Sequence, residues 1–168
     1  MAEPEVVQLL VQVSRLGRIH DAVLARLAAR HGLMASETAG LLMLWWAGPP
    51  HRLRPSVLAE ALVQTTGGMT ATLRRLAEAG FVERVPDPDD GRVSLAALTP
   101  AGEAAGRASL ADMVDWYDEA LVDVPARQRT RIVAAMGTLL GAVEAADGHA
   151  PTAGLAFDAD GTMVRPRR

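Results

Sequence analysis

Apolar residues recur at helical spacing along most of this 168-residue chain. Near the N-terminus they follow one another in steps of three, four or seven, at Val6, Leu9, Val13, Leu16, Val23 and Leu27. This pattern predicts a long helix over about 4–30 with a single apolar seam. His20 occupies one heptad position of that seam, between Val13 and Leu27. Such a seam requires a partner helix to cover it.

Capping and breaking residues divide the rest of the chain into shorter elements. Ser36 and Thr66 are expected to cap helices, and Gly80 is expected to stop one. Thr99-Pro100 combines a hydroxyl cap with proline at the first helical position. The expected helices are 37–46, 56–63, 67–79, 99–122 and 126–147, and the expected strands are 52–54, 81–85 and 93–98. On the last helix, Ile132, Met136, Leu139 and Val143 are expected to face inward.

The composition changes after residue 147, where glycine, proline and aspartate become frequent. Residues 148–168 are therefore interpreted as a C-terminal tail, with two alternatives for its structure. Leu155–Val164 forms a small hairpin around Asp160-Gly161, or the tail is disordered. Residues 1–147 are expected to form one mainly helical domain that carries a small β hairpin.

Composition excludes several classes of function. The chain has no cysteine, which excludes disulfides and thiolate zinc sites, and its four histidines lack ligand spacing. We therefore expect no metal site and no cofactor, and the absence of a readable nucleophile–base pair or glycine-rich loop argues against an enzyme. No apolar run approaches the roughly 18 residues of a membrane span. The acidic N-terminus lacks the basic region of a secretory signal, which favours a cytoplasmic protein.

The helix expected over 67–79 has two distinct faces. Met69, Leu73 and Leu76 form its apolar stripe at about 100° per residue. Small and basic residues lie outside that stripe, namely Gly67, Gly68, Thr70, Ala71, Arg74 and Arg75. Small residues let a helix backbone approach a DNA groove, its N-terminus favours phosphate, and arginine binds guanine or phosphate. The alternative is an ordinary amphipathic surface helix.

The hairpin that follows this helix strengthens the DNA-binding interpretation. Asp90 and Arg92 flank Gly91 at its tip, and their carboxylate and guanidinium are expected to form an ion pair that directs Arg92 towards DNA. A solvated turn with an incidental ion pair is the alternative. The net charge of −3 argues mildly against nucleic-acid binding, but phosphates respond to the charge of one face and not to the total.

These motifs occur in a specific order: GPPHRLRPSVLAEAL, TTGGMTATLRRLAEAGFVERVPDPDDGR and LTPAG. Over about residues 6–147 the chain resembles the MarR family of bacterial winged helix-turn-helix transcriptional regulators. The resemblance implies a DNA-binding lobe over about 33–98 and dimerisation helices over about 4–31 and 99–147. It also implies a homodimer that reads a pseudo-palindromic operator, more often as a repressor of neighbouring genes than as an activator. The candidate DNA contacts are Thr66, Gly67, Gly68, Thr70, Ala71, Arg74, Arg75, Arg92 and Arg54.

Two positions depart from the family pattern. Gly91 stands at the wing tip, where the family commonly has arginine, so the resemblance implies a weaker minor-groove contact there. Arg54 stands where a capping threonine is frequent, which removes a side-chain cap and adds a charge near the DNA side. A winged-helix module that binds other proteins, with weak or no DNA binding, is therefore the alternative function.

Members of this family often release DNA when a small aromatic or anionic molecule binds between the dimerisation helices and the winged lobe. The candidate lining residues for such an effector are His20, Trp45, Trp46, Trp116 and Tyr117. Their rings can stack on a ligand and donate hydrogen bonds to it. The alternative is that the tryptophans and Tyr117 pack in the core and that His20 is a hydrogen-bonded or interface histidine.

Overall fold

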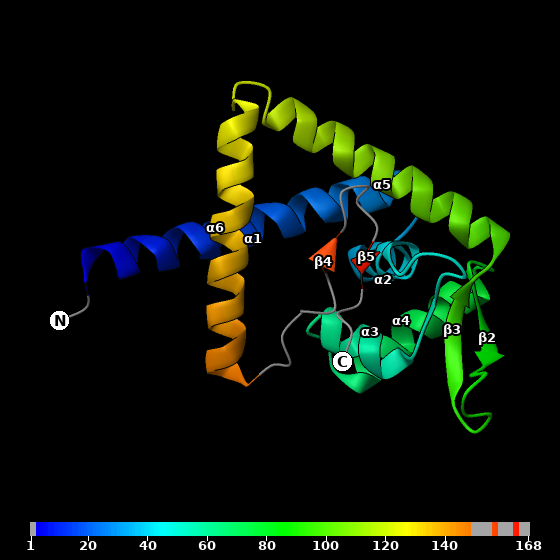
Figure 1. Cartoon of the computed structure of the whole chain (residues 1–168). Coiled ribbons are helices and arrows are strands. Elements are labelled where there is room, and N and C mark those ends of the chain that lie inside the picture. Colours follow the sequence, from blue (N-terminus) through cyan, green and yellow to red (C-terminus); the bar gives the residue numbers. More distant parts are fainter. Residues whose placement is uncertain (1–2, 149–155, 158–162, 165–168) are drawn as a thin grey trace.

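Helices dominate the computed structural model, which describes residues 3–148 and the backbone of 156–157 and 163–164 (Figure 1). The helices are α1 (Pro4–Arg30), α2 (Ala35–Trp46), α3 (Pro55–Ala61), α4 (Thr66–Glu78), α5 (Pro100–Ala120) and α6 (Ala126–Asp147). The strands are β1 (Arg52–Leu53), β2 (Val82–Pro86), β3 (Ser94–Leu98), β4 (Ala156–Phe157) and β5 (Met163–Val164). The predicted mainly helical fold with a small β wing is confirmed. None of the helices in the described ranges is both long enough and apolar enough to cross a bilayer.

The wing is a small antiparallel sheet with strand order β1-β3-β2. Its hairpin pairs Val82 with Leu98 at the base and Pro86 with Ser94 near the tip. The edge strand β1 pairs Arg52 with Ala97, as expected from the short Arg-Leu-Arg segment. In Figure 1 the hairpin projects away from the helices beyond the end of α4. The wing is thus anchored on the helix-turn-helix and open at its tip.

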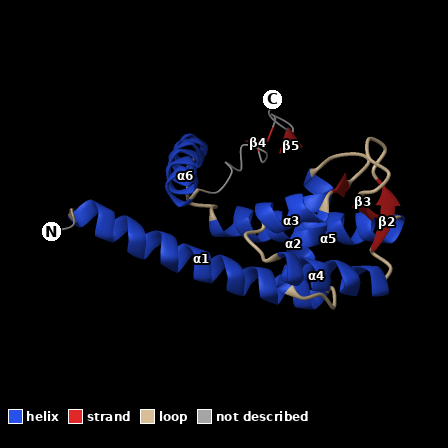
Figure 2. Ribbon diagram, turned by 90° about the horizontal axis from the view of Figure 1, so that it is seen from below, coloured by secondary structure: helices blue, strands red, loops and turns tan. Residues whose placement is uncertain are grey.

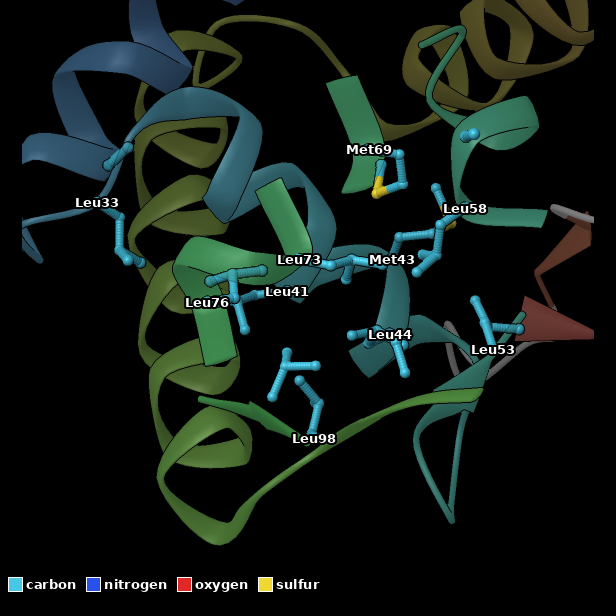
Figure 3. Close-up of a cluster of buried hydrophobic side chains, with 14 residues drawn as sticks. Leu33, Leu41, Met43, Leu44, Leu53, Leu58, Met69, Leu73, Leu76 and Leu98 are labelled. Carbon is cyan, nitrogen blue, oxygen red and sulfur yellow. The ribbon is translucent and has the colours of Figure 1, made fainter. Parts of the chain in front are cut away.

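The core forms around α2, which packs against α1, α4 and α5. Leu41 and Leu44 of α2 are fully buried. Figure 3 shows them meeting Leu76 of α4, Leu58 of α3 and other leucines and methionines from the surrounding elements. Each fully buried leucine of this kind stabilises the fold by about 1.5–3 kcal/mol. This shared core fixes α4 and the wing relative to each other.

The N-caps of α2 and α4 lie one or two residues before those expected. Thr65 caps α4, because its side chain accepts a hydrogen bond from the Gly68 amide at 3.1 Å, and Thr66 is already helical. Met34 holds the N-cap position of α2, where the Glu37 carboxylate accepts a hydrogen bond from its amide at 2.8 Å. Ser36 and Thr66 were each wrong as caps because the extended backbone that a cap requires occurs earlier.

The restart of the helix after the wing matches its prediction. Thr99 caps α5 by accepting from the Gly102 amide at 3.1 Å, and its hydroxyl donates to the Gly80 carbonyl at 2.7 Å. Thr99 therefore ties the start of α5 to the end of α4. At Gly102 an added Cβ would lie 1.9 Å from the Phe81 carbonyl oxygen. A glycine is needed here because the two backbones touch.

Two apolar helix faces are left exposed by the part of the chain that the structure describes. In the N-terminal half of α1, Val6, Val13 and Leu16 are exposed, whereas Val23 and Leu27 near its other end are buried. None of the described residues of α6 is buried. Its stripe was expected to face inward, but Ile132, Met136 and Val143 are exposed because α6 stands apart from the other helices, as the end-on view in Figure 2 shows.

The tail contains the short antiparallel pair β4–β5, with Ala156 opposite Val164 and Phe157 opposite Met163. This pairing agrees with the hairpin alternative for the tail. The turn expected at Asp160-Gly161 lies outside the described residues.

Candidate nucleic-acid interface

The two faces predicted for α4 are present. Met69, Leu73 and Leu76 are buried, at 1%, 3% and 0% exposure. The opposite face exposes Thr66, Gly67, Gly68, Thr70 and Arg74, with Ala71 half-buried beside them. This exposed face is called the reading face below. The apolar stripe fixes the helix in the core and leaves the reading face open to a groove.

The first turn of α4 presents backbone with little side chain in the way. A Cβ added at Gly67 would meet no heavy atom within 4 Å. Thr70 donates its hydroxyl to the Thr66 carbonyl at 2.8 Å, so its oxygen stays at the helix surface. The first-turn amides of Thr66 and Gly67 have no partner within the helix and can bind a phosphate oxygen.

Arg74 is the exposed cation of the reading face. Its Nη1 lies 3.3 Å from Glu78 Oε1, and both side chains are more than 60% exposed. An exposed pair of this kind contributes about 0.3–0.5 kcal/mol. A phosphate or a guanine edge can therefore displace Glu78 at little cost.

The Arg75 guanidinium does not project from the reading face, where the sequence placed it. Its Nε donates to Glu37 Oε1 at 2.7 Å, and Glu37 is nearly buried on α2. The guanidinium thus points back from α4 to α2. Arg75 lies on the same side of α4 as Gly68 and Ala71, so it is the side chain, held by Glu37, that turns away from the reading face.

The ion pair expected between Asp90 and Arg92 is corrected by the structure. Asp90 Oδ1 accepts a hydrogen bond from the backbone amide of Arg92 at 3.1 Å. Within residues 3–148 no ion pair joins the two side chains. Asp90 therefore forms a local turn, because a carboxylate two residues before an amide is well placed to accept from it. Arg92 remains exposed on the wing, and its guanidinium is free to take another position.

Arg54 forms an ion pair with Asp87 of the wing. Its Nη2 and Nε donate to Asp87 Oδ2 at 2.6 and 2.9 Å. Asp87 is buried, whereas Arg54 is about half exposed. The pKa of Asp87 is lowered, first by the hydrogen bond from the Asp89 backbone amide and then by Arg54. The expected loss of a side-chain cap at Arg54 is confirmed, but the guanidinium braces the wing instead of standing free on the DNA side.

A hollow of about 240 Å³ opens between α4 and the wing. Its walls are mostly apolar, and its polar side chains are Thr70, Arg74 and Arg84. Sequence reasoning missed Arg84. The alternation of β2 offered a signal, since Arg84 lies two residues after Val82 and so shares the face of the strand that lines this hollow. Arg84 adds a second exposed cation beside the reading face.

Four of the five candidate effector residues lie near one another. His20 Nδ1 shares a hydrogen bond of 2.8 Å with the Tyr117 hydroxyl, and Trp116 meets the Tyr117 ring edge-on at 4.9 Å. Trp46, Trp116 and Tyr117 all pack against the smaller apolar cluster formed by α1, α2 and Met113. Burial raises the pKa of Tyr117 above its usual value. The hydrogen bond to Tyr117 agrees with the alternative in which His20 is a hydrogen-bonded histidine.

Trp45 is not among the residues that pack against the smaller cluster. Its ring stacks on His51, with 4.7 Å between ring centroids and 6° between planes. The Arg107 guanidinium lies 5.3 Å from the centroid of the same ring. Trp45 packs against the larger core cluster, so the structure favours the core alternative for this residue.

Comparisons with known proteins agree with the geometry. A family profile described as the MarR family matches residues 41–93. The regulator MmpR5 of Mycobacterium tuberculosis is 32% identical over 152 residues, which cover 85% of this chain and 82% of that protein. The regulator PecS of Dickeya dadantii is 27% identical, over 74% of this chain and 75% of that protein. Both relatives are HTH-type transcriptional regulators.

Solved structures share the fold at lower identity. A mutant MarR from E. coli in complex with operator DNA has a TM-score of 0.67 and 22% identity, covering 83% of this chain and 99% of that chain. BldR from Sulfolobus solfataricus has a TM-score of 0.71 and 20% identity, covering 83% of this chain and 98% of that chain. With the fold, the ordered motifs and a relative at 32% identity all in agreement, the chain belongs to the MarR family of DNA-binding transcriptional regulators.

Proposed function

We propose that this protein is a cytoplasmic homodimer that binds a pseudo-palindromic operator and represses neighbouring genes until a small aromatic or anionic effector releases it. The DNA-binding lobe in this proposal is about 33–98, and the dimerisation helices are about 4–31 and 99–147. As a member of a family of transcriptional regulators, the chain is not an enzyme.

The reading face of α4 carries the DNA-binding proposal. Its first turn exposes Gly67 and Gly68, and about two turns after Gly67 the side chain of Arg74 projects from the same side with only a weak partner. Arg92 is exposed on the wing, and Arg84 lines the hollow between α4 and the wing together with Arg74. Cations that flank a helix with an open first turn fit a major groove and its phosphates.

The uncovered apolar faces support the homodimer. Exposed apolar side chains continue along the N-terminal half of α1 and along α6, and leaving them in water is unfavourable. A second copy offers the same two faces, so a twofold axis buries both. Two α4 helices related by that axis would enter successive major grooves about 34–36 Å apart. Light scattering is expected to give twice the chain mass.

A gel-shift titration with the DNA upstream of the protein's own gene tests operator binding. Arg74→Ala is expected to weaken binding by about 1–3 kcal/mol and to relax sequence preference at one position of each half-site. Glu78→Gln is the matched control, because it removes the partner of Arg74 without removing a cation. It should leave affinity unchanged or raise it. If no fragment shifts at low salt, the protein-interaction module becomes the better function.

The effector part of the proposal places the ligand beside His20, Trp46, Trp116 and Tyr117. The hydrogen bond between His20 and Tyr117 provides polar groups that an anionic or phenolic ligand can use, and the tryptophan rings provide stacking surface. Benzoate serves as a simple aromatic anion for the test. It is expected to quench tryptophan fluorescence and release bound DNA in the wild type, and to do both less well in Tyr117→Phe.

A further inference from the structure

Both oxygens of the Glu37 carboxylate are in use. Oε2 accepts from the Met34 amide at 2.8 Å and so fixes the start of α2. Oε1 accepts from Arg75 Nε at 2.7 Å and so fixes α4. The Glu37 side chain is only 10% exposed, which makes this one of the few charged groups taken out of water. One carboxylate therefore joins the first turn of α2 to α4.

The Arg75 side chain is also held on its own helix. Arg75 Nη2 also lies 3.4 Å from the hydroxyl of buried Thr72, so the guanidinium is held on the side of α4 that faces α2. Successive residues on a helix are about 100° apart, so the position of Arg75 fixes the direction in which Arg74 projects. A small rotation of α4 about its axis would move every side chain of the reading face.

The segment that carries Glu37 is attached at its other end to α5. His31 Nε2 donates to Asp112 Oδ2 at 3.1 Å, and Arg30 Nη1 lies 3.7 Å from the same oxygen. The short α1–α2 junction thus has one end on α5 and the other, through Glu37, on α4. This arrangement adds polar contacts to the apolar packing of α2 that already joins α5, a proposed dimerisation helix, to α4.

We propose that Glu37 is a positioning residue for DNA recognition, acting through Arg75, and that Arg75 serves this role instead of contacting DNA. The inference rests on the proposed DNA binding for its functional consequence, but its structural part concerns the free protein. Removal of either partner leaves the other charge partly desolvated and unpaired, so α4 would be held by its apolar stripe alone and could rotate more freely about its axis.

A double-mutant cycle with Glu37→Gln and Arg75→Met tests the role. Each single variant is expected to weaken operator binding by about tenfold, and the double variant should be no weaker than the worse single, because the two residues act as one unit. The salt dependence of binding should keep its wild-type slope in all three. Arg74→Ala is the comparison, since loss of a phosphate contact reduces that slope by about 1.

The direction of the Glu37→Gln effect is decisive. This change removes a negative charge and frees Arg75, so a DNA-contacting Arg75 would bind operator as well as before or better. Unchanged or tighter binding by Glu37→Gln, together with a reduced salt slope in Arg75→Met, would overturn the proposal. Titrations run below the melting temperature of every variant keep unfolding out of the comparison.

Amide hydrogen exchange on the free protein separates this inference from the proposed function. Glu37→Gln should speed exchange across Thr66–Glu78 and leave Pro55–Ala61 near the wild-type rate, whether or not an operator is known. Unchanged exchange in Thr66–Glu78 would overturn the positioning role even if the protein binds DNA. Faster exchange in a protein that shifts no DNA would instead count against the proposed function alone.

Discussion

Arg54 at the start of α3 and Asp87 at the end of β2 are joined by two hydrogen bonds, from Nη2 at 2.6 Å and Nε at 2.9 Å to the same carboxylate oxygen. The other oxygen of Asp87 accepts from the Asp89 amide at 3.0 Å, which shapes the loop of the wing. The wing is therefore tied to the helix-turn-helix through one carboxylate. From the sequence, Arg54 was a candidate for contact with DNA, but in the structure its charge holds the wing.

The first prediction concerns pH. The pKa of Asp87 is lowered from 3.8 by the Asp89 amide and then by Arg54, so the folded state favours the ionised carboxyl. The resulting stability is present at pH values above 3.8 and is lost as the pH falls through the lower folded value. Asp87→Asn should therefore unfold more readily than the wild type at neutral pH. Urea titrations from pH 7 down to strongly acid conditions should show this difference shrinking.

Asp89→Asn is the control for this prediction. Asp89 is exposed and, among the described residues, its carboxylate is in no ion pair. Its replacement should leave the pH dependence of unfolding close to that of the wild type. Equal pH profiles for Asp87→Asn and the wild type would show that the brace does not contribute to stability.

The second prediction concerns Val63, in the turn between α3 and α4. Its φ of 49° lies in the left-handed region, and its side chain is 75% exposed. A branched residue in this region destabilises the folded state by about 1–2 kcal/mol. Glycine relieves this strain but lowers stability by about 0.4–1 kcal/mol, because it makes the unfolded chain more flexible. Val63→Gly should therefore raise the free energy of unfolding by about 0.5–1 kcal/mol, measured by urea denaturation.

Val57→Gly should lower the free energy of unfolding if the left-handed φ of Val63 causes the gain in Val63→Gly. Val57 is also partly exposed but lies inside α3, where glycine lowers stability. A loss of stability in both variants would mean that the Val63 side chain makes a contact worth more than its backbone strain.

The third prediction concerns the contact between α5 and the end of α4. Gly102→Ala would place a Cβ 1.9 Å from the Phe81 carbonyl oxygen, and backbone cannot move aside as a flexible side chain does. We expect a loss of about 1–3 kcal/mol or more in the free energy of unfolding. Gly106→Ala, on the same helix with its nearest neighbour at 3.6 Å, should be neutral or stabilising. Similar losses in both would point to helix α5 as a whole instead of this contact.

Much of the fold was predictable because local signals and burial agree. The stripe Met69, Leu73 and Leu76 follows helical spacing, and the structure buries all three. Thr99-Pro100 marks the start of α5 because a hydroxyl cap followed by proline favours the first turn of a helix without any tertiary contact. Ser36 and Thr66 failed as caps because neighbouring residues compete for the same role, and only the backbone path decides between them.

The partners of charged side chains were not predictable from the sequence. Arg75 and Glu37 are 38 residues apart, and Arg54 and Asp87 are 33 apart, so no local spacing joins either pair. Asp90 was a reasonable partner for Arg92 by proximity alone, but its turn geometry offered the backbone amide first. The exposed α6 stripe shows the same limit, because periodicity reveals an apolar face without revealing whether the same chain covers it.

The fourth prediction separates folding from DNA recognition at Gly67. Alanine at this position meets no atom within 4 Å and suits a helix better than glycine, so Gly67→Ala should stabilise the protein by up to about 1 kcal/mol. If the open first turn of α4 serves close approach to the groove, the added methyl should nevertheless weaken operator binding about tenfold, or about 1.4 kcal/mol. Thermal melting and gel-shift titration of the same samples measure both effects, with Gly106→Ala as a control that should leave DNA affinity unchanged. Tighter or equal DNA binding by Gly67→Ala would mean that the first turn of α4 stays clear of the DNA backbone and bases.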